Sequence, residues 1–215
     1  MKRIPKKTIN SIIEILGATY PQAKTALNYE TPFQFLTAAI LSAQCTDARV
    51  NIVTADLFAR FKTASDFTKL SQDELIGYIK PCGFFRNKSK NIIACAKIIS
   101  DKFAGILPAD IDLLTRLPGV GRKTANVVLS NIYNIPAIAV DTHVFRVSRR
   151  IGLSVSDTPD KVEQDLMYII PEKNWSSIHH QLIYLGRSIC SARKPKCGIC
   201  PLNKFCGYTK SHVIL

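Results

Sequence analysis

Four cysteines near the end of the sequence constrain this chain more than any other feature. They follow the spacing C-x6-C-x2-C-x5-C, and they are Cys190, Cys197, Cys200 and Cys206. Four thiolates this close together can bind a zinc ion or an iron–sulfur cluster. The spacing favours a metal centre, but by itself it does not separate zinc from iron–sulfur. Three further cysteines are dispersed, and we expect them to be buried as small hydrophobic residues: Cys45, Cys82 and Cys95.

Apolar residues recur every three or four positions along most of the chain, which is the pattern of amphipathic helices. The predicted helices are residues 33–43, 47–61, 87–103, 110–116, 122–133, 142–151, 159–169 and 175–189. One strand-like run, residues 137–140, is too short to build a sheet. Helices joined by short loops predict an all-α fold. The tail from Cys190 onward is rich in Cys, Lys, Pro and Gly, and we expect loops there.

The charge of the chain indicates a polyanionic partner. Its 215 residues are enough for a sizeable core, and 29 Lys and Arg stand against 16 Asp and Glu, a net charge of +13. This excess suits nucleic acid, although lysines scattered over the surface are the simpler alternative. The apolar stretches are too short to cross a membrane, and the basic start MKRIPKK lacks the apolar segment of a signal peptide. We therefore expect a cytoplasmic protein without a membrane partner or structural disulfides.

A glycine-rich turn, PGVGRKT at residues 118–124, connects two predicted helices. Its glycines permit positive φ and close approach of another backbone. The N–H groups at the start of the second helix can bind a phosphate oxygen. The expected DNA-binding residues of this turn are Gly119, Val120, Gly121, Arg122 and Thr124. A plain turn between two helices is the alternative.

Lys123 and Asp141 are the candidate catalytic residues. Lys123 lies in the first turn of the second helix, where the helix dipole and Arg122 disfavour the ammonium form. A neutral amine is a nucleophile that can form a Schiff base. Asp141 is the predicted N-cap of helix 142–151, and its carboxylate can accept a proton or stabilise a cationic sugar. A solvated lysine and a purely capping aspartate are the alternatives.

Two further groups of cations are candidates for phosphate contacts. The loop within the cysteine group carries three cations that attachment at both ends would hold in place: Arg193, Lys194 and Lys196. Helix 142–151 carries three more, which either contact phosphates or form a solvated face: Arg146, Arg149 and Arg150.

Several segments occur together in order: LSAQCTD (41–47), LPGVGRKTA (117–125), VDTHVFRV (140–147) and the cysteine spacing. With them the chain resembles the endonuclease III family of DNA glycosylases, in the helix-hairpin-helix superfamily, from about residue 21 to 206. The resemblance implies two helical domains with the active site in the cleft between them. Residues 22–134 would form a helical barrel with the hairpin at about 111–131. Residues 1–21 and 135–215 would form the second domain, whose loop 190–206 would hold one 4Fe-4S cluster rather than zinc.

The resemblance also implies the chemistry. Lys123 would attack C1′ of the damaged nucleotide with help from Asp141, and β-elimination from a Schiff base would cut the strand 3′ to the abasic site. The substrates would be oxidised pyrimidines such as thymine glycol, or abasic sites, in double-stranded DNA, and the enzyme would be a monomer. Gln44 and Phe84 would fill the gap left by the extruded base, with phenylalanine where many relatives have leucine. His143 would lie near the DNA backbone, or serve only a structural role.

Two other functions are compatible with parts of the sequence. An adenine-mismatch glycosylase of the same superfamily would act through a glutamate in helix 33–43, which contains no carboxylate, and would lack Lys123. A non-catalytic helix-hairpin-helix DNA-binding module would share the charge and the hairpin. Such a module needs neither Lys123 nor Asp141, so the two residues together favour a bifunctional DNA glycosylase and AP lyase.

Overall fold

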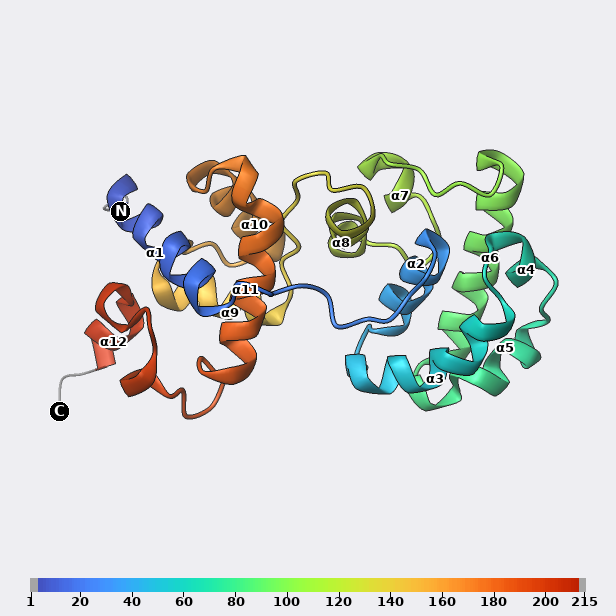
Figure 1. Ribbon diagram of the computed structural model, residues 1–215, viewed down its shortest axis with the longest axis horizontal. Coiled ribbons are helices and arrows are strands. Elements are labelled where there is room, and N and C mark those ends of the chain that lie inside the picture. The colour runs from blue at the N-terminus through green and yellow to red at the C-terminus, as the bar shows by residue number, and fades with distance from the viewer. Residues whose placement is uncertain (1–3, 213–215) are drawn as a thin grey trace. The chain divides into compact units, whose positions relative to one another are not determined.

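The computed structural model describes residues 4–212, so Met1, Lys2 and Arg3 of the basic N-terminal stretch lie outside it. Within this range the chain forms helices and no strand, which confirms the all-α prediction (Figure 1). The chain divides into two compact units, residues 1–25 with 134–215 and residues 26–133. The boundaries expected from the sequence were 21/22 and 134/135.

The unit 26–133 is built around α2, which is buried on every side. Its helices are α2 (Pro32–Leu41), α3 (Asp47–Arg60), α4 (Ala64–Thr68), α5 (Gln72–Ile79), α6 (Phe85–Phe103), α7 (Ile111–Thr115) and α8 (Arg122–Ile132), with a 3-10 turn at Lys80–Cys82. α2 begins at a capping box between Thr31 and Gln34, with Pro32 in the first turn, and residues 33–41 are all buried. α6 packs against α4 and α5, while α8 packs against α2 and α7 (Figure 1).

Two short helices of this unit, α4 and α5, were not predicted from the sequence. Each begins at a capping box, Thr63 with Asp66 and Ser71 with Glu74. These boxes satisfy the first backbone N–H groups and so allow very short helices. The pattern T/S-x-x-D/E was the signal that could have revealed both.

The other unit joins the two ends of the chain in one core. Its helices are α1 (Lys6–Thr19), α9 (Thr142–Ile151), α10 (Pro159–Ile169), α11 (Trp175–Ser188) and α12 (Gly207–His212), with 3-10 turns at Glu172–Asn174, Cys197–Ile199 and Asn203–Phe205. α1, which was also missed, buries Ile9, Ile12 and Leu16 and packs against α11 (Figure 1). The expectation that the tail from Cys190 is all loop is wrong, because it contains two 3-10 turns and α12. Residues 137–140 are buried and form no strand.

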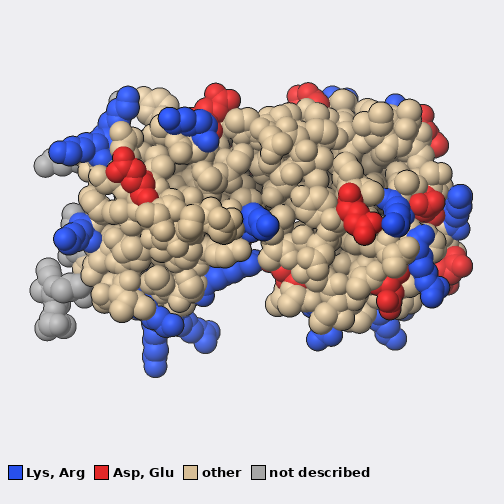
Figure 2. Space-filling model, in the orientation of Figure 1, with Lys and Arg blue, Asp and Glu red and all other residues tan. Residues whose placement is uncertain are grey.

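Positive charge is unequally distributed between the two units. Residues 1–25 and 134–215 contain 16 Lys and Arg against 7 Asp and Glu, whereas residues 26–133 contain 13 against 9. On the face drawn in Figure 2, acidic side chains are accordingly more frequent on the unit 26–133. Among the described helices, none combines the length and apolarity that crossing a bilayer requires.

Candidate functional site

The turn between α7 and α8 is a tight loop with internal hydrogen bonds. The N–H of Leu117 donates to the carbonyl of Leu114 at 3.0 Å, and the N–H of Val120 donates to the carbonyl of Leu117 at 3.1 Å. Gly119 has φ +76, and a Cβ on it would stand 2.8 Å from Nδ2 of Asn91 on α6. The backbone conformation and the packing therefore both require glycine at this position.

Gly121 differs from Gly119, because its φ is −88 and any residue can adopt that conformation. A Cβ on Gly121 would meet nothing within 4 Å. Gly121 is the N-cap of α8, and it supplies no side chain to the N–H groups of the first helical turn. The space around the start of α8 is thus left open within this unit, as phosphate binding by the backbone would require.

A buried thiol of α6 fixes the turn from a second side. Sγ of Cys95 donates to the carbonyl of Pro118 at 3.0 Å. Burial raises the pKa of Cys95 to about 12, so the thiol stays protonated and remains a donor. Asn91 and Cys95 are one helical turn apart on α6, and both contact the hairpin. The sequence predicted Cys45, Cys82 and Cys95 to be buried, which is confirmed for Cys82 and Cys95, whereas Cys45 is only partly buried. It did not reveal the contact of Cys95 with Pro118.

Lys123 is exposed in the first turn of α8. The helix begins with the hydrogen bond from the N–H of Ala125 to the carbonyl of Gly121, at 3.0 Å. Ala125, Val128 and Leu129 are buried. Their burial keeps Lys123 on the exposed side of the helix. In the described part of the chain Lys123 forms no ion pair, so no carboxylate there neutralises its side chain.

Asp141 is the N-cap of α9, which confirms that prediction. Its Oδ1 accepts hydrogen bonds from the N–H groups of His143 and Val144, both at 2.8 Å. The helix itself starts with the bond from the N–H of Phe145 to the carbonyl of Asp141, also at 2.8 Å. Both capping bonds use Oδ1, and Oδ2 accepts no hydrogen bond from the described residues.

His143 and Arg146 are packed where α9 meets α11. Burial lowers the pKa of His143, and the neighbouring Asp141 partly opposes that change. A Cβ on Gly186 of α11 would stand 2.9 Å from Cβ of His143, so the two helices are in close contact here. Arg146 donates from Nη2 to the carbonyl of Gly186 at 2.9 Å and from Nε to that of Cys190 at 3.1 Å. Arg146 therefore ties α9 to the end of α11, and a DNA contact from either residue stays a prediction.

The two residues expected to enter the DNA, Gln44 and Phe84, are both exposed. Phe84 is 66% exposed and precedes α6, so it is not a core residue. Both adopt the left-handed backbone conformation, with φ 53 at Gln44 and φ 46 at Phe84. That conformation is unfavourable for residues other than glycine, and it is often found at functional sites.

The four C-terminal cysteines line one common cavity. In the described part of the chain no three ligand side chains converge closely enough to hold a single metal ion. The four thiols surround this cavity, and four thiolates are the ligands that an iron–sulfur cluster takes. Burial raises the pKa of Cys200, and the three other thiols raise it further. Positively charged iron atoms would offset both effects, so these residues fit an iron–sulfur cluster.

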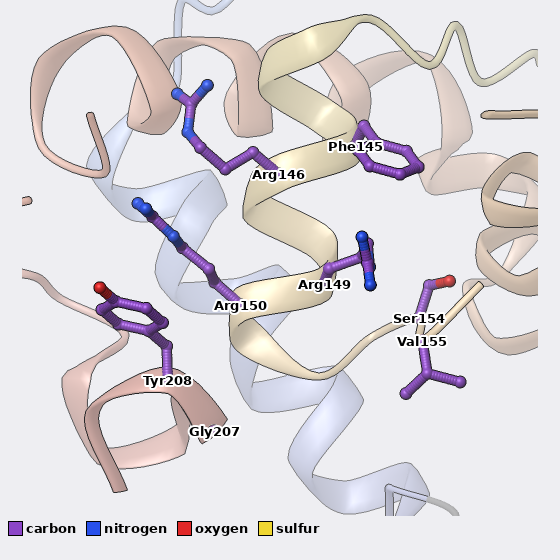
Figure 3. A pocket seen from close by; sticks show the side chains of 8 residues that line it. All are labelled: Phe145, Arg146, Arg149, Arg150, Ser154, Val155, Gly207 and Tyr208. Carbon is purple, nitrogen blue, oxygen red and sulfur yellow. The ribbon is translucent and has the colours of Figure 1, made fainter. Parts of the chain in front are cut away.

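Arg150 of α9 holds the first part of the cysteine loop. Figure 3 shows its side chain on the same side of α9 as Tyr208. Nη1 of Arg150 donates to the carbonyl of Ser191 at 2.7 Å and its Nη2 to that of Ala192 at 2.9 Å. The guanidinium carbon of Arg150 lies 4.6 Å from the ring centroid of Tyr208, so Arg150 also contacts α12. The sequence left Arg150 as a phosphate contact or a solvated residue, and neither alternative included this role. Arg149 is the exposed member of the three arginines, and it stacks on Phe145.

The side chains of the three loop cations are exposed, and hydrogen bonds at the backbone hold the residues that carry them: Arg193, Lys194 and Lys196. Oγ of Ser191 donates to the carbonyl of Arg193 at 2.7 Å, and the N–H of Lys196 donates to that of Ile189 at 3.0 Å. These two bonds connect the backbone within the loop and join it to Ile189, just after α11. That attachment of the loop at both ends holds its cations in place stays a prediction.

Lys88 of α6, close to the loops of Gln44 and Phe84, was not identified from the sequence. It is 5% exposed, and its ammonium is enclosed by three backbone carbonyls. A signal was present, because Lys88 is in line with the apolar positions Ile92, Cys95 and Ile99 of α6. A lysine on an apolar stripe predicts a buried or partly buried amine.

Comparison with known proteins identifies the family. Residues 37–172 match the HhH-GPD superfamily of base excision DNA repair proteins, and residues 190–206 match the iron–sulfur binding domain of endonuclease III. Endonuclease III of Rickettsia conorii is 49% identical over 200 residues, which cover 93% of this chain and 95% of that protein. The chain belongs to the endonuclease III family. Endonuclease III of Bacillus subtilis is 46% identical over 201 residues, covering 93% of this chain and 92% of that protein.

Two solved structures of endonuclease III match with a TM-score of 0.92 and 44% identity, over 98% of this chain and 99% of theirs. One is a non-covalent complex with DNA, and the other is a trapped covalent intermediate with DNA. As an endonuclease III family member, the chain is a base excision repair enzyme, a DNA glycosylase with AP lyase activity. Its cofactor is a 4Fe-4S cluster, which decides between the zinc and iron–sulfur alternatives that the spacing left open.

Proposed function

We propose that this enzyme removes oxidised pyrimidines from double-stranded DNA with Lys123 as the nucleophile. The observation that carries the proposal is the exposed amine of Lys123 in the first turn of α8, after a hairpin that Asn91 and Cys95 hold in place. An amine that must reach a sugar carbon benefits from a rigid support, because small errors of position slow a reaction strongly.

In the proposed reaction, Nζ of Lys123 attacks C1′ of the damaged nucleotide. The bond from C1′ to the base breaks, and the base leaves with the bonding electrons and takes up a proton. Opening of the sugar ring, with loss of the remaining proton on nitrogen, gives a Schiff base between Lys123 and C1′. Removal of a proton from C2′ then expels the 3′-phosphate by β-elimination and cuts the strand. Water hydrolyses the Schiff base and restores the amine.

Asp141 assists this reaction as a carboxylate that is held in place without being fully used by hydrogen bonds. Its Oδ1 binds the first turn of α9 through two N–H groups. Oδ2 is left to take a proton from the attacking amine or to stabilise positive charge on the sugar.

DNA is bound mainly through its backbone. The open start of α8 around Gly121 receives one phosphate, and the exposed cations Arg193, Lys194 and Lys196 contact others. A damaged base has to leave the stack before Lys123 can reach its sugar. Gln44 and Phe84 occupy the vacated space, since both are exposed and Phe84 presents an apolar ring.

The 4Fe-4S cluster is held by Cys190, Cys197, Cys200 and Cys206. When bound, it supplies iron–thiolate bonds that tie the two ends of the loop together. Arg150 already fixes the first part of that loop, and Leu202 within it is completely buried in the core of its unit. These contacts hold the loop against its unit, so a cluster bound between its ends also restricts the movement of the cations at the loop surface.

We further propose that the enzyme acts as a monomer in the cytoplasm, bound to the nucleoid. The net charge of +13 suits attraction to DNA, and all proposed catalytic residues come from one chain. Sedimentation of the purified protein at micromolar concentration tests the first part, and a dimer would contradict it.

The test of the proposed function is borohydride trapping on a duplex that carries one thymine glycol. The proteins are the wild type, Lys123→Gln and the control Lys97→Gln, which removes an exposed lysine of α6. A covalent adduct is expected with the wild type and the control and not with Lys123→Gln. An adduct that persists in a folded Lys123→Gln would show that another nucleophile acts. Base release by the wild type without any adduct would indicate attack by water. Faster release of an oxidised purine would contradict the preference for pyrimidines.

A further inference from the structure

The amine of Lys88 is buried and uses all of its donors. Nζ donates to the carbonyls of Leu41, Ala43 and Cys82, at 2.9, 2.7 and 2.9 Å. An ammonium group has three N–H donors, so these three bonds satisfy it completely. Among the described residues Lys88 has no ion-pair partner, and backbone carbonyls alone compensate the buried charge.

The three carbonyls belong to two loops that are far apart in the sequence. Leu41 and Ala43 lie at the end of α2 and in the connection to α3, directly before Gln44. Cys82 lies in the connection from α5 to α6, two residues before Phe84. One amine thus joins the loop of Gln44 to the loop of Phe84.

Both loops contain backbone that needs external support. Gln44 has φ 53, and the second loop has two consecutive positive values, φ 65 at Gly83 and φ 46 at Phe84. A left-handed conformation is unfavourable for a residue other than glycine, so it persists where neighbouring contacts enforce it. The bonds from Lys88 supply such contacts one residue before Gln44, at Ala43, and two residues before Phe84, at Cys82.

We propose that Lys88 is a positioning residue for base extrusion, which holds Gln44 and Phe84 at a fixed separation so that both enter the duplex at the same lesion. The inference rests on the proposed function, in which these two residues fill the gap left by the damaged base. A buried charge is rarely the best choice for stability alone. An ammonium group has three N–H donors on one atom, so it can satisfy the three carbonyls that the two loops direct at it. Burial lowers the pKa of Lys88, and the nearby thiols of Cys82 and Cys45 partly oppose that change.

The matched pair of variants is Lys88→Met and Lys90→Met. Both remove one lysine from α6, but Lys90 is exposed and donates to none of the three loop carbonyls. Two substrates separate positioning from general loss of structure. A duplex with thymine glycol paired to adenine requires extrusion of the base, whereas a single strand with an abasic site has no pair to open.

We expect Lys88→Met to lower single-turnover cleavage of the thymine glycol duplex by about 10²-fold, the order of effect known for misplaced groups. Borohydride trapping on the single-stranded abasic site should change little, and Lys90→Met should behave as the wild type on both. If Lys88→Met lowered duplex cleavage and single-strand trapping equally, Lys88 would only maintain the structure, and the proposal would be overturned. Absence of an adduct with the wild type itself would contradict the proposed function instead.

A double-mutant cycle provides a second test that tolerates some loss of stability. Gln44→Ala with Phe84→Ala removes the two side chains that Lys88 is proposed to position. In that background Lys88→Met should have little further effect on the thymine glycol duplex, because residues that act as one unit are not additive. Additive losses would show that Lys88 acts by another route and would overturn the proposal.

Discussion

The side chain of Asn91 lies directly against Gly119, with its Nδ2 2.8 Å from the position that a Cβ on the glycine would occupy. This contact joins the middle of α6 to the turn that presents Lys123. It also distinguishes the two glycines of that turn, which the sequence alone treats as equivalent.

Gly119→Ala should therefore lower the free energy of unfolding by about 2 kcal/mol or more. The added methyl group meets Asn91, and alanine is disfavoured at the φ of +76 that Gly119 adopts. Gly121→Ala should cost less than about 1 kcal/mol, since its backbone suits alanine and its surroundings are open. Gly121→Ala should nevertheless weaken DNA binding by obstructing the start of α8. Urea unfolding and DNA titration of both variants check this, and the opposite order of stabilities would contradict it.

Replacement of Asp141 can separate its capping role from its charge. Asn is as good an N-cap as Asp, so Asp141→Asn should leave the unfolding midpoint nearly unchanged. Loss of the carboxylate should slow base release by about 10²–10⁴-fold. Asp141→Ala should show the same slow reaction and a further loss of about 1 kcal/mol of stability. Single-turnover kinetics and thermal unfolding provide the measurements. A rate for Asp141→Asn close to the wild type would confine Asp141 to capping.

Removal of one proposed cluster ligand should release the iron and loosen the C-terminal loop. Cys200→Ala is expected to lose iron and the thermal stability of its unit together, because the cluster ties the loop that buries Leu202. Cys45→Ala is the matched control, since Cys45 lies outside the loop and is also only partly buried. Iron analysis and calorimetry of the purified proteins decide the question. Full iron content in Cys200→Ala would remove Cys200 from the ligand set.

The stability of the unit that contains α11 should fall in mild acid because of His180. Burial lowers the pKa of His180 to about 4 from an ordinary value of 6.5. As the pH falls below 6.5, the unfolded chain takes up a proton at this residue while the folded chain does not, so folding stability decreases until about pH 4. The total loss is at most about 3 kcal/mol. His180→Gln should flatten the decline in unfolding free energy between these two pH values. Parallel curves for the variant and the wild type would assign the decline to other groups.

Sequence patterns predicted the parts of this fold that depend on neighbouring residues. The cap at Asp141 was predicted because capping acts over two or three positions. The bonds of Arg150 to Ser191 and Ala192 span more than 40 positions, and no local pattern contains them.

The same distinction holds for the candidate site: the sequence predicted the features that neighbouring residues determine, and it did not predict those that depend on distant contacts. The hairpin, Lys123 and the cysteine spacing are contiguous or nearly so, and the sequence located all of them. The exposure of Phe84 was expected from the family resemblance alone, and no local pattern predicts it, since a phenylalanine in an apolar region is more often buried.

The packing of α1 against α11 has a consequence for the order in which the newly made chain can fold. Residues 26–133 emerge from the ribosome as one continuous segment and can complete their core while synthesis continues. α1 emerges before them, but its partner helix α11 and the cysteine loop are made after them. The apolar stripe of Ile9, Ile12 and Leu16 therefore stays without its native partner while residues 26–133 are synthesised. α1 is made before the continuous unit but can be buried only after it.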